Sequence, residues 1–224
     1  AQFPPVEIKV DRGTVLIEGK IDRVDVLGNP ESSGAEFVKI IDYKSGSDKF
    51  SAEEAMDGWK LQLMIYLKAA VQGLQKEAAE NKTEAAAVKP AGVFYFGISE
   101  PMIDSGELSA EERAGRVADQ IKRSFRLDGV LLQENLVIES LDSGISGYSD
   151  VVPIRLTKDG YAGTSARRLL SEEDFQQFIG AVDQTIETLC KEFLAGSIEI
   201  KPKKRKNETA CTYCDYKSIC NYEN

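Results

Sequence analysis

Histidine is missing from this sequence, which has none among its 224 residues. Imidazole is the usual acid–base group near neutral pH and the commonest metal ligand, so its absence excludes both roles within this chain. Any chemistry here must use carboxylates, lysine, tyrosine or cysteine. The sequence also lacks the run of roughly 18 apolar residues that a membrane-spanning helix needs, and its start lacks a signal-peptide pattern. We therefore expect a cytoplasmic protein with no membrane partner.

Positive charge is in deficit, with 28 lysines and arginines against 37 acidic residues and a net charge of -9. This balance argues against a free-standing protein that finds DNA or an anionic membrane by bulk attraction. It is compatible with a metal-dependent site, because hard cations bind carboxylates and a larger partner can supply a positive field. The one basic run, Lys201 to Lys206, indicates a solvated linker, with phosphate contact as the alternative.

Hydrophobic residues make up 42% of the chain, enough to bury one sizeable core. The sequence starts "AQFPP" without methionine, and a strand pattern begins almost at once, so we expect a piece of a longer polypeptide. Alternation of apolar and polar residues predicts strands, and apolar spacing with capping residues predicts helices. The expected strands are 6–10, 14–26, 37–44 and 91–99, and the expected helices are 55–79, a second after Ser109 and a third from Ser171 towards Gly196. This order favours a mixed sheet flanked by helices, followed by a Cys-rich tail.

The stretch "KIIDYKSG" places two charged residues at the end of an apolar strand. Residues two apart share one face of a strand, so Asp42 and Lys44 point together while Ile41 and Tyr43 point oppositely, into packing. An isolated D-x-K pair is most often a surface ion pair. Charges at the end of a strand apolar enough to be central need another reason, and this favours a site.

A second carboxylate lies in "EGKIDRVDV", where we expect Asp22 late in the neighbouring strand and within reach of Asp42. Two such carboxylates repel unless a proton or a cation lies between them, and oxygen ligands suit Mg²⁺ or Mn²⁺. Asp25 is the weaker candidate, because it faces the other side of the strand. On the next helix, Gln62 and Tyr66 lie four residues apart on one face and can overhang the same site.

The tail carries three cysteines, Cys211, Cys214 and Cys220, with the spacing C-x2-C-x5-C. This spacing suits a metal or a cluster better than mutual disulfides, and we expect the three sulfurs to face a common point. A fourth ligand is needed. It is either Cys190, which its own pattern indicates to be a half-buried helix residue, or a residue outside this chain. Spacing alone does not separate an iron–sulfur cluster from zinc.

Five segments in series resemble the nuclease domain of the RecB-type PD-(D/E)XK superfamily, and within it the C-terminal domains of the AddB family of helicase–deoxyribonuclease subunits. The segments are "GKIDRVD", "IIDYKSG", "QLMIY", "PAGVFYFGI" and "CTYCDYKSIC". The resemblance implies a restriction-endonuclease-like α/β core over residues 1–200 and a basic linker with an iron–sulfur tail over 201–224. It also implies an AddA-type helicase–nuclease partner, a DNA strand as substrate, and double-strand break processing for recombination.

The resemblance further implies a role for each candidate residue. Asp22 and Asp42 would bind magnesium, the carbonyl of Tyr43 would assist, and Lys44 would be the catalytic lysine. Gln62 and Tyr66 would help to hold the DNA strand. In similar nucleases the three tail cysteines, with one upstream cysteine, hold a 4Fe–4S cluster.

Two family features are missing: the upstream cysteine and the upstream histidine that commonly adds a metal ligand. Truncation explains both. The alternatives are a catalytically silent module that binds DNA or braces a larger assembly, and a stand-alone CRISPR-associated or phage-type exonuclease with the same tail. The presence of Asp22, Asp42 and Lys44 together favours an active nuclease, and the excised-looking start of the chain counts against a stand-alone enzyme.

Overall fold

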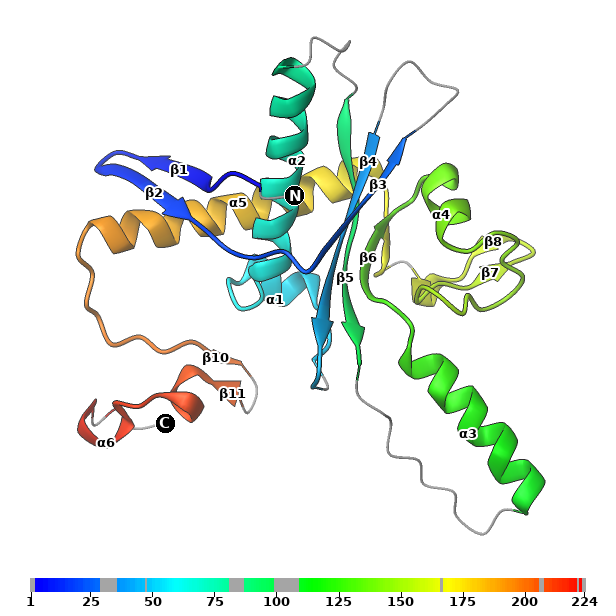
Figure 1. Ribbon diagram of the computed structural model, residues 1–224. Helices are drawn as coiled ribbons and strands as arrows, with labels where there is room; N and C mark the ends of the chain where they lie inside the picture. Colours follow the sequence, from blue (N-terminus) through cyan, green and yellow to red (C-terminus); the bar gives the residue numbers. More distant parts are fainter. Residues whose placement is uncertain are drawn as a thin grey trace.

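A mixed β-sheet forms the centre of the computed structural model (Figure 1). The structure describes residues 3–28, 36–46, 48–80, 87–98, 109–165, 167–205, 208–220 and 222. The five strands lie in the order β3 (Arg23–Gly28), β4 (Glu36–Lys44), β5 (Val88–Gly97), β6 (Asp128–Leu132) and β9 (Leu169–Leu170). β4 pairs antiparallel with β3 and parallel with β5, and β5 pairs antiparallel with β6, which pairs parallel with β9. The mixed sheet predicted from the sequence is thus confirmed.

Helices cover both faces of this sheet. α2 (Gln62–Glu80) and α5 (Glu172–Leu194) lie on one side, and α4 (Asn135–Leu141) lies on the other (Figure 1). Both faces of the central strands are therefore buried, and Val38, Ile40 and Val93 are 0% exposed. α3 (Ala110–Ser124) projects from the body, and its surface is mostly exposed. No helix in the described ranges is long and apolar enough to cross a membrane.

Three of the helix ends predicted from the sequence are confirmed: the start of α3 and both ends of α5. Ser109 and Glu112 form a capping box at α3, and the Ser171 hydroxyl accepts the Asp174 amide at 3.1 Å at the start of α5. α5 ends at Leu194, two residues before Gly196, whose φ of 70° is the left-handed conformation that glycine adopts readily after a helix.

Two predicted elements are each divided in the structure. The predicted strand 14–26 is split into β2 (Gly13–Ile17), which forms a separate hairpin with β1 (Val6–Val10), and β3. The predicted helix 55–79 is divided into the short helix α1 (Ala52–Met56), which Ser51 caps, and the long helix α2. Gly58, with φ 83°, lies in the turn between α1 and α2, a conformation that a continuous helix does not allow.

The remaining elements are short. They are β7 (Leu156–Thr157), β8 (Gly160–Tyr161), β10 (Lys204–Arg205), β11 (Glu208–Thr209), the 3₁₀ turns Gly163–Ser165 and Ala210–Tyr213, and α6 (Lys217–Cys220). The last of these belong to the C-terminal tail, which an extended segment separates from the end of α5 (Figure 1).

Candidate active site

The end of β4 carries a buried ion pair. Asp42 is 3% exposed, and Nζ of Lys44 lies 2.8 Å from its Oδ2 atom, so the two side chains do share one face as the strand period requires. On the opposite face Ile41 is 4% exposed. Tyr43, expected to be packed, is instead 39% exposed, because it lies where the strand leaves the sheet. The apolar run therefore buries a carboxylate and presents an ammonium group beside it.

Asp22 lies at the same level of the sheet. It immediately precedes β3 rather than lying within a strand, which corrects the sequence-based placement. The register pairs Arg23 with Ile41, so Asp22 falls opposite Asp42. Its Oδ2 atom accepts a hydrogen bond from the Tyr43 amide at 3.0 Å, which fixes the carboxylate against the end of β4.

The first turn of α2 lies over the ion pair. Nζ of Lys44 donates to Oε1 of Gln62 at 3.0 Å, and Nε2 of Gln62 donates to the Tyr66 hydroxyl at 3.0 Å. Tyr66 in turn packs on Gly19, where an added Cβ would lie 3.0 Å from the tyrosine ring. The chain Lys44–Gln62–Tyr66 thus links the end of β4 to a helix, and it joins residues that the sequence analysis had singled out separately.

Tyr95 is a further component, which the sequence analysis missed. It pairs with Asp42 across the parallel β4–β5 ladder, and Nζ of Lys44 lies 5.0 Å from its ring centroid, within cation–π range. Burial, together with the carboxylates of Asp42 and three other acidic residues, raises the pKa of Tyr95 to about 12, so it is neutral near pH 7. Its position in the apolar segment "AGVFYFGIS" had indicated core packing alone.

The chain that follows Lys44 is also held in place. The Asp128 carboxylate accepts the Phe50 amide at 2.6 Å and forms an ion pair with Arg168 at 2.9 Å. Arg168 donates to the Phe50 carbonyl at 3.2 Å, while Lys60 donates to the Lys49 carbonyl at 2.6 Å. Nothing in the sequence pattern pointed to these contacts, which join segments up to 118 residues apart.

The carboxylates fit a divalent cation. Within the described residues, Oδ2 of Asp42 accepts no hydrogen bond, and its contact with Lys44 is an ion pair without hydrogen-bond geometry. A buried carboxylate oxygen of this kind, beside the Asp22 carboxylate, is a ligand that hard cations favour. Among the same residues no group of three acidic or thiol side chains comes together, so the described side chains offer a cation here only these two carboxylates.

Asp25 lies on the opposite face of the sheet from Asp42 and is therefore not part of this site. The Asp25 carboxylate pairs with Arg23 at 2.7 Å and with Lys39 at 3.0 Å. Burial by itself would raise the pKa of Asp25, but the hydrogen bonds from Arg23 and Lys39 outweigh it, and the pKa lies below its ordinary value. The same contact with Asp25, with a smaller one from Tyr43, raises the pKa of Arg23.

The tail cysteines do not form a site on their own. Cys214 is exposed and Cys211 and Cys220 are partly so, but the part of the chain that is described brings no three thiols or carboxylates into one group. The expected common point for the three sulfurs is therefore not found. Cys190 is a buried core residue of α5, 6% exposed, and burial raises the pKa of its thiol.

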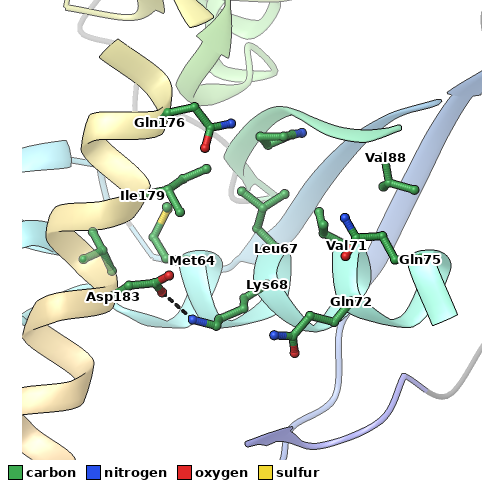
Figure 2. A pocket seen from close by; sticks show the side chains of 12 residues that line it. Met64, Leu67, Lys68, Val71, Gln72, Gln75, Val88, Gln176, Ile179 and Asp183 are labelled. Carbon is green, nitrogen blue, oxygen red and sulfur yellow. Dashed lines mark ion pairs between the residues drawn. The ribbon is translucent and has the colours of Figure 1, made fainter. Parts of the chain in front are cut away.

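A cavity of about 360 Å³ lies away from these residues, between α2 and α5 (Figure 2). Its lining combines apolar residues such as Met64, Leu67 and Ile179 with polar ones, and the Lys68–Asp183 ion pair closes one side at 2.8 Å. None of the candidate site residues lines it. We therefore place the candidate chemistry at the end of β4 and not in this cavity.

Comparison with known proteins shows the family to which the chain belongs. The family model described as the PD-(D/E)XK nuclease superfamily matches residues 1–221. The chain is 36% identical over 222 residues to the AddB-type subunit of the ATP-dependent helicase/deoxyribonuclease from Alkaliphilus metalliredigens (strain QYMF). It is 37% identical over 223 residues to the protein of the same name from Clostridium tetani (strain Massachusetts / E88). These matches cover 99% of this chain and 18% of each relative, so the chain spans less than a fifth of their length.

Proposed function

Because the chain belongs to the PD-(D/E)XK nuclease superfamily, we propose that it hydrolyses phosphodiester bonds of a DNA strand with Mg²⁺ or Mn²⁺ at the end of β4. One observation carries the proposal. The carboxylates of Asp22 and Asp42 and the ammonium group of Lys44 converge where β4 ends, and Asp42 keeps a buried oxygen without a hydrogen bond from any described residue. This combination suits phosphoryl chemistry better than a surface ion pair.

Each residue has a definite role in this proposal. Asp22 and Asp42 hold the cation, with the Tyr43 carbonyl as an additional ligand. When bound, the cation supplies Lewis-acid stabilisation of the phosphoryl group and acidifies water. Lys44 donates hydrogen bonds to the attacking water and to the scissile phosphate, and so stabilises the charge that develops in the transition state. Gln62 holds Lys44 at 3.0 Å, and with Tyr66 it positions the DNA strand.

The names of the relatives extend the proposal to a larger enzyme. Each relative is one subunit of an ATP-dependent helicase/deoxyribonuclease. We propose that this chain is the nuclease domain of such a subunit, working with an AddA-type helicase–nuclease subunit that delivers a single DNA strand. Its exonuclease activity would then serve double-strand break processing for recombination in the cytoplasm. The net charge of -9 fits a domain that depends on a larger assembly to attract DNA.

The proposal also covers the C-terminal tail, whose three cysteines would form a metal or cluster site with a fourth ligand from outside this chain. We propose that Cys211, Cys214 and Cys220 are three of the four ligands of a 4Fe–4S cluster, with zinc as the alternative. Three thiolates fall one short of either site, and the buried Cys190 is a poor fourth ligand. Iron, sulfide and zinc analysis of the anaerobically purified full-length protein decides between them: iron with a visible absorbance band supports the cluster, and one zinc in colourless protein supports the alternative.

A cleavage assay tests the nuclease function. In the full-length protein with its helicase–nuclease partner, we expect EDTA-sensitive digestion of linear DNA. Asp42→Ala and Lys44→Ala should each abolish digestion by this nuclease centre while DNA binding persists. Binding lost in parallel with cleavage would assign the two residues a structural role. Unchanged cleavage in both variants would refute the proposal.

A further inference from the structure

The end of β4 has a second cleft on the face opposite Asp42 and Lys44. Its volume is about 330 Å³, and its lining includes three aromatic residues, Tyr43, Phe96 and Phe125, with the basic residues Arg23 and Lys39. Tyr43 lies between Asp42 and Lys44 in the chain, so the candidate active site and this cleft are separated by the thickness of one strand. A DNA strand that crosses the end of β4 can therefore meet both.

The aromatic residues form a partly exposed platform. The rings of Phe96 and Phe125 are stacked, with centroids 6.0 Å apart and planes at 21°, and Tyr43 meets Phe96 edge-on at 5.7 Å. Phe125 is 47% exposed and Tyr43 is 39% exposed. Phe125 is held in this position because it caps the end of α3, where its amide bonds to the Ile121 carbonyl. The platform therefore offers ring surface to a planar partner from a fixed backbone.

The surroundings of the platform are positively charged, in contrast to the chain as a whole. Arg23 and Lys39 share the single carboxylate of Asp25, and Lys122 and Arg126 share the single carboxylate of Asp150. Asp119 also lies close enough to Lys122 to act on its charge, so these four cations face three carboxylates. An anion in the cleft would meet Arg23 and Lys39, two cations that share one carboxylate.

We propose that this cleft binds a nucleotide of single-stranded DNA, with its base stacked on the Tyr43–Phe96–Phe125 platform and its phosphate near Arg23 and Lys39. Stacking on aromatic rings beside basic residues is the general way in which proteins hold single strands without reading sequence. The nucleotide is a neighbour of the one cleaved, because the cleft adjoins the candidate active site through Tyr43. The inference rests on the proposed function for the identity of the ligand, and it adds a binding site on the opposite face of the sheet.

Binding of short dT oligonucleotides to the full-length protein tests this site, in an Asp42→Asn background that prevents cleavage. We expect Phe125→Ala to weaken binding about fivefold or more, and Phe125→Trp to retain it. Phe193→Ala is the matched control, because it makes the same substitution at an exposed phenylalanine that does not line the cleft. Phe193 is 73% exposed and lies near the C-terminal end of α5. It should bind like the parent protein. Circular dichroism and thermal unfolding of each variant establish that the fold is intact.

Abasic residues identify the interaction as base stacking. One abasic position in the oligonucleotide should cost the parent protein the same factor as Phe125→Ala, and should cost the Phe125→Ala variant nothing further. Affinity unchanged by Phe125→Ala, or equal losses for Phe125→Ala and Phe125→Trp, would overturn the proposal. So would an effect of Phe125→Ala on proteolytic resistance of the full-length protein without an effect on DNA, which would make this face a protein interface.

The outcomes separate this inference from the proposed function. A parent protein with Asp42 intact that cleaves DNA, together with a Phe125→Ala variant of unchanged affinity, refutes the cleft alone. A protein that does not cleave but binds dT with the Phe125 dependence described refutes the nuclease function and supports the cleft. The two results cannot be confused, because one is read as hydrolysis and the other as binding in a background that does not cleave.

Discussion

The ammonium group of Lys44 is restrained from three sides. Asp42 lies 2.8 Å away, Gln62 accepts its hydrogen bond at 3.0 Å, and the Tyr95 ring lies beneath it at 5.0 Å. A lysine side chain otherwise loses roughly 1.5–2 kcal/mol of conformational entropy when it is fixed. Because the fold has already restricted this side chain, Lys44 can act as a donor in a fixed direction.

Replacement of Tyr95 tests the contribution of its ring. Tyr95→Phe keeps a ring face for Lys44, so we expect a near-parental cleavage rate. Tyr95→Leu removes a cation–π contact of about 0.5–2 kcal/mol, and we expect a single-turnover rate about 2- to 30-fold lower. DNA affinity and thermal unfolding serve as controls. Equal rates for the two variants would show that the ring does not orient Lys44.

Asp25 supports a prediction about pH. Its pKa is lowered in the folded protein, so its interactions with Arg23 and Lys39 stabilise the fold above the ordinary aspartate pKa, about 3.9. That contribution is lost as the pH falls through the lower, folded-state pKa. Asp25→Asn should therefore reduce the free energy of unfolding by about 0.5–1 kcal/mol at pH 7, with a smaller difference at pH 3. Urea unfolding at both pH values measures this. A difference that is the same or larger at pH 3 would contradict the ion-pair explanation.

At the scale of single residues, the sequence predicts contacts between side chains that are two residues apart in a strand or four apart in a helix. Asp42 and Lys44 share a face because they are two apart, and Gln62 and Tyr66 are bonded because they are four apart. Tyr95 and Arg168 could not be found in this way. An apolar run does not reveal which strand lies beside it, and Tyr95 acts across the β4–β5 pairing. Arg168 acts on Phe50, which is 118 residues away in the sequence.

At the scale of elements, the close approach of β5 and β6 depends on glycine. Gly129 pairs with Phe94, and an added Cβ would lie 1.8 Å from the carbonyl oxygen of Val93 and 2.7 Å from the Phe94 ring. No side-chain rotation relieves a clash with backbone, so the strands must move apart. β6 also begins with Asp128, which holds Phe50, so the strand spacing bears on the segment that follows Lys44.

Two alanine substitutions test this dependence as a matched pair. Gly129→Ala should destabilise the protein by about 3 kcal/mol, because overpacking costs up to this amount or more in a filled core. Gly180→Ala in α5, where an added Cβ meets nothing within 4 Å, should stabilise it by about 0.5–1 kcal/mol. Chemical denaturation of both variants gives the comparison. A neutral Gly129→Ala would show that β5 and β6 do not approach as described.

Capping residues in the sequence predicted the ends of helices correctly. Ser109, Ser171 and Gly196 marked helix ends correctly because caps use bonds within one turn. The breaks at 18–22 and 57–61 were missed although each contains a glycine, Gly19 and Gly58, because the apolar spacing on the two sides of each break matches one continuous element. The position of Asp22 just outside β3 is a consequence of the first break, and its bond to the Tyr43 amide replaces a ladder contact.

At the scale of the whole molecule, composition and element order predicted the mixed sheet with helices on both faces. They did not predict the strand order. β9, for example, consists of only two residues, and it pairs with β6 although some 36 residues separate the two strands in the sequence. The candidate active site and the aromatic cleft both lie where β4 ends, because β4 is next to the edge strand β3 and its two faces open at that end. The tail differs: its three cysteines are close in sequence, yet among the described residues they do not come together as one group of ligands.

Binding of Mn²⁺ to the full-length protein tests the central claim most directly, because it reports the cation site without requiring cleavage. Electron paramagnetic resonance titration should show that Asp22→Asn and Asp42→Asn each lose one bound Mn²⁺ relative to the parent protein, or bind it at least tenfold more weakly. Asp25→Asn, on the same pair of strands but the opposite face, should bind Mn²⁺ like the parent. Parental Mn²⁺ binding in Asp42→Asn would contradict the assignment of the end of β4 as the catalytic centre.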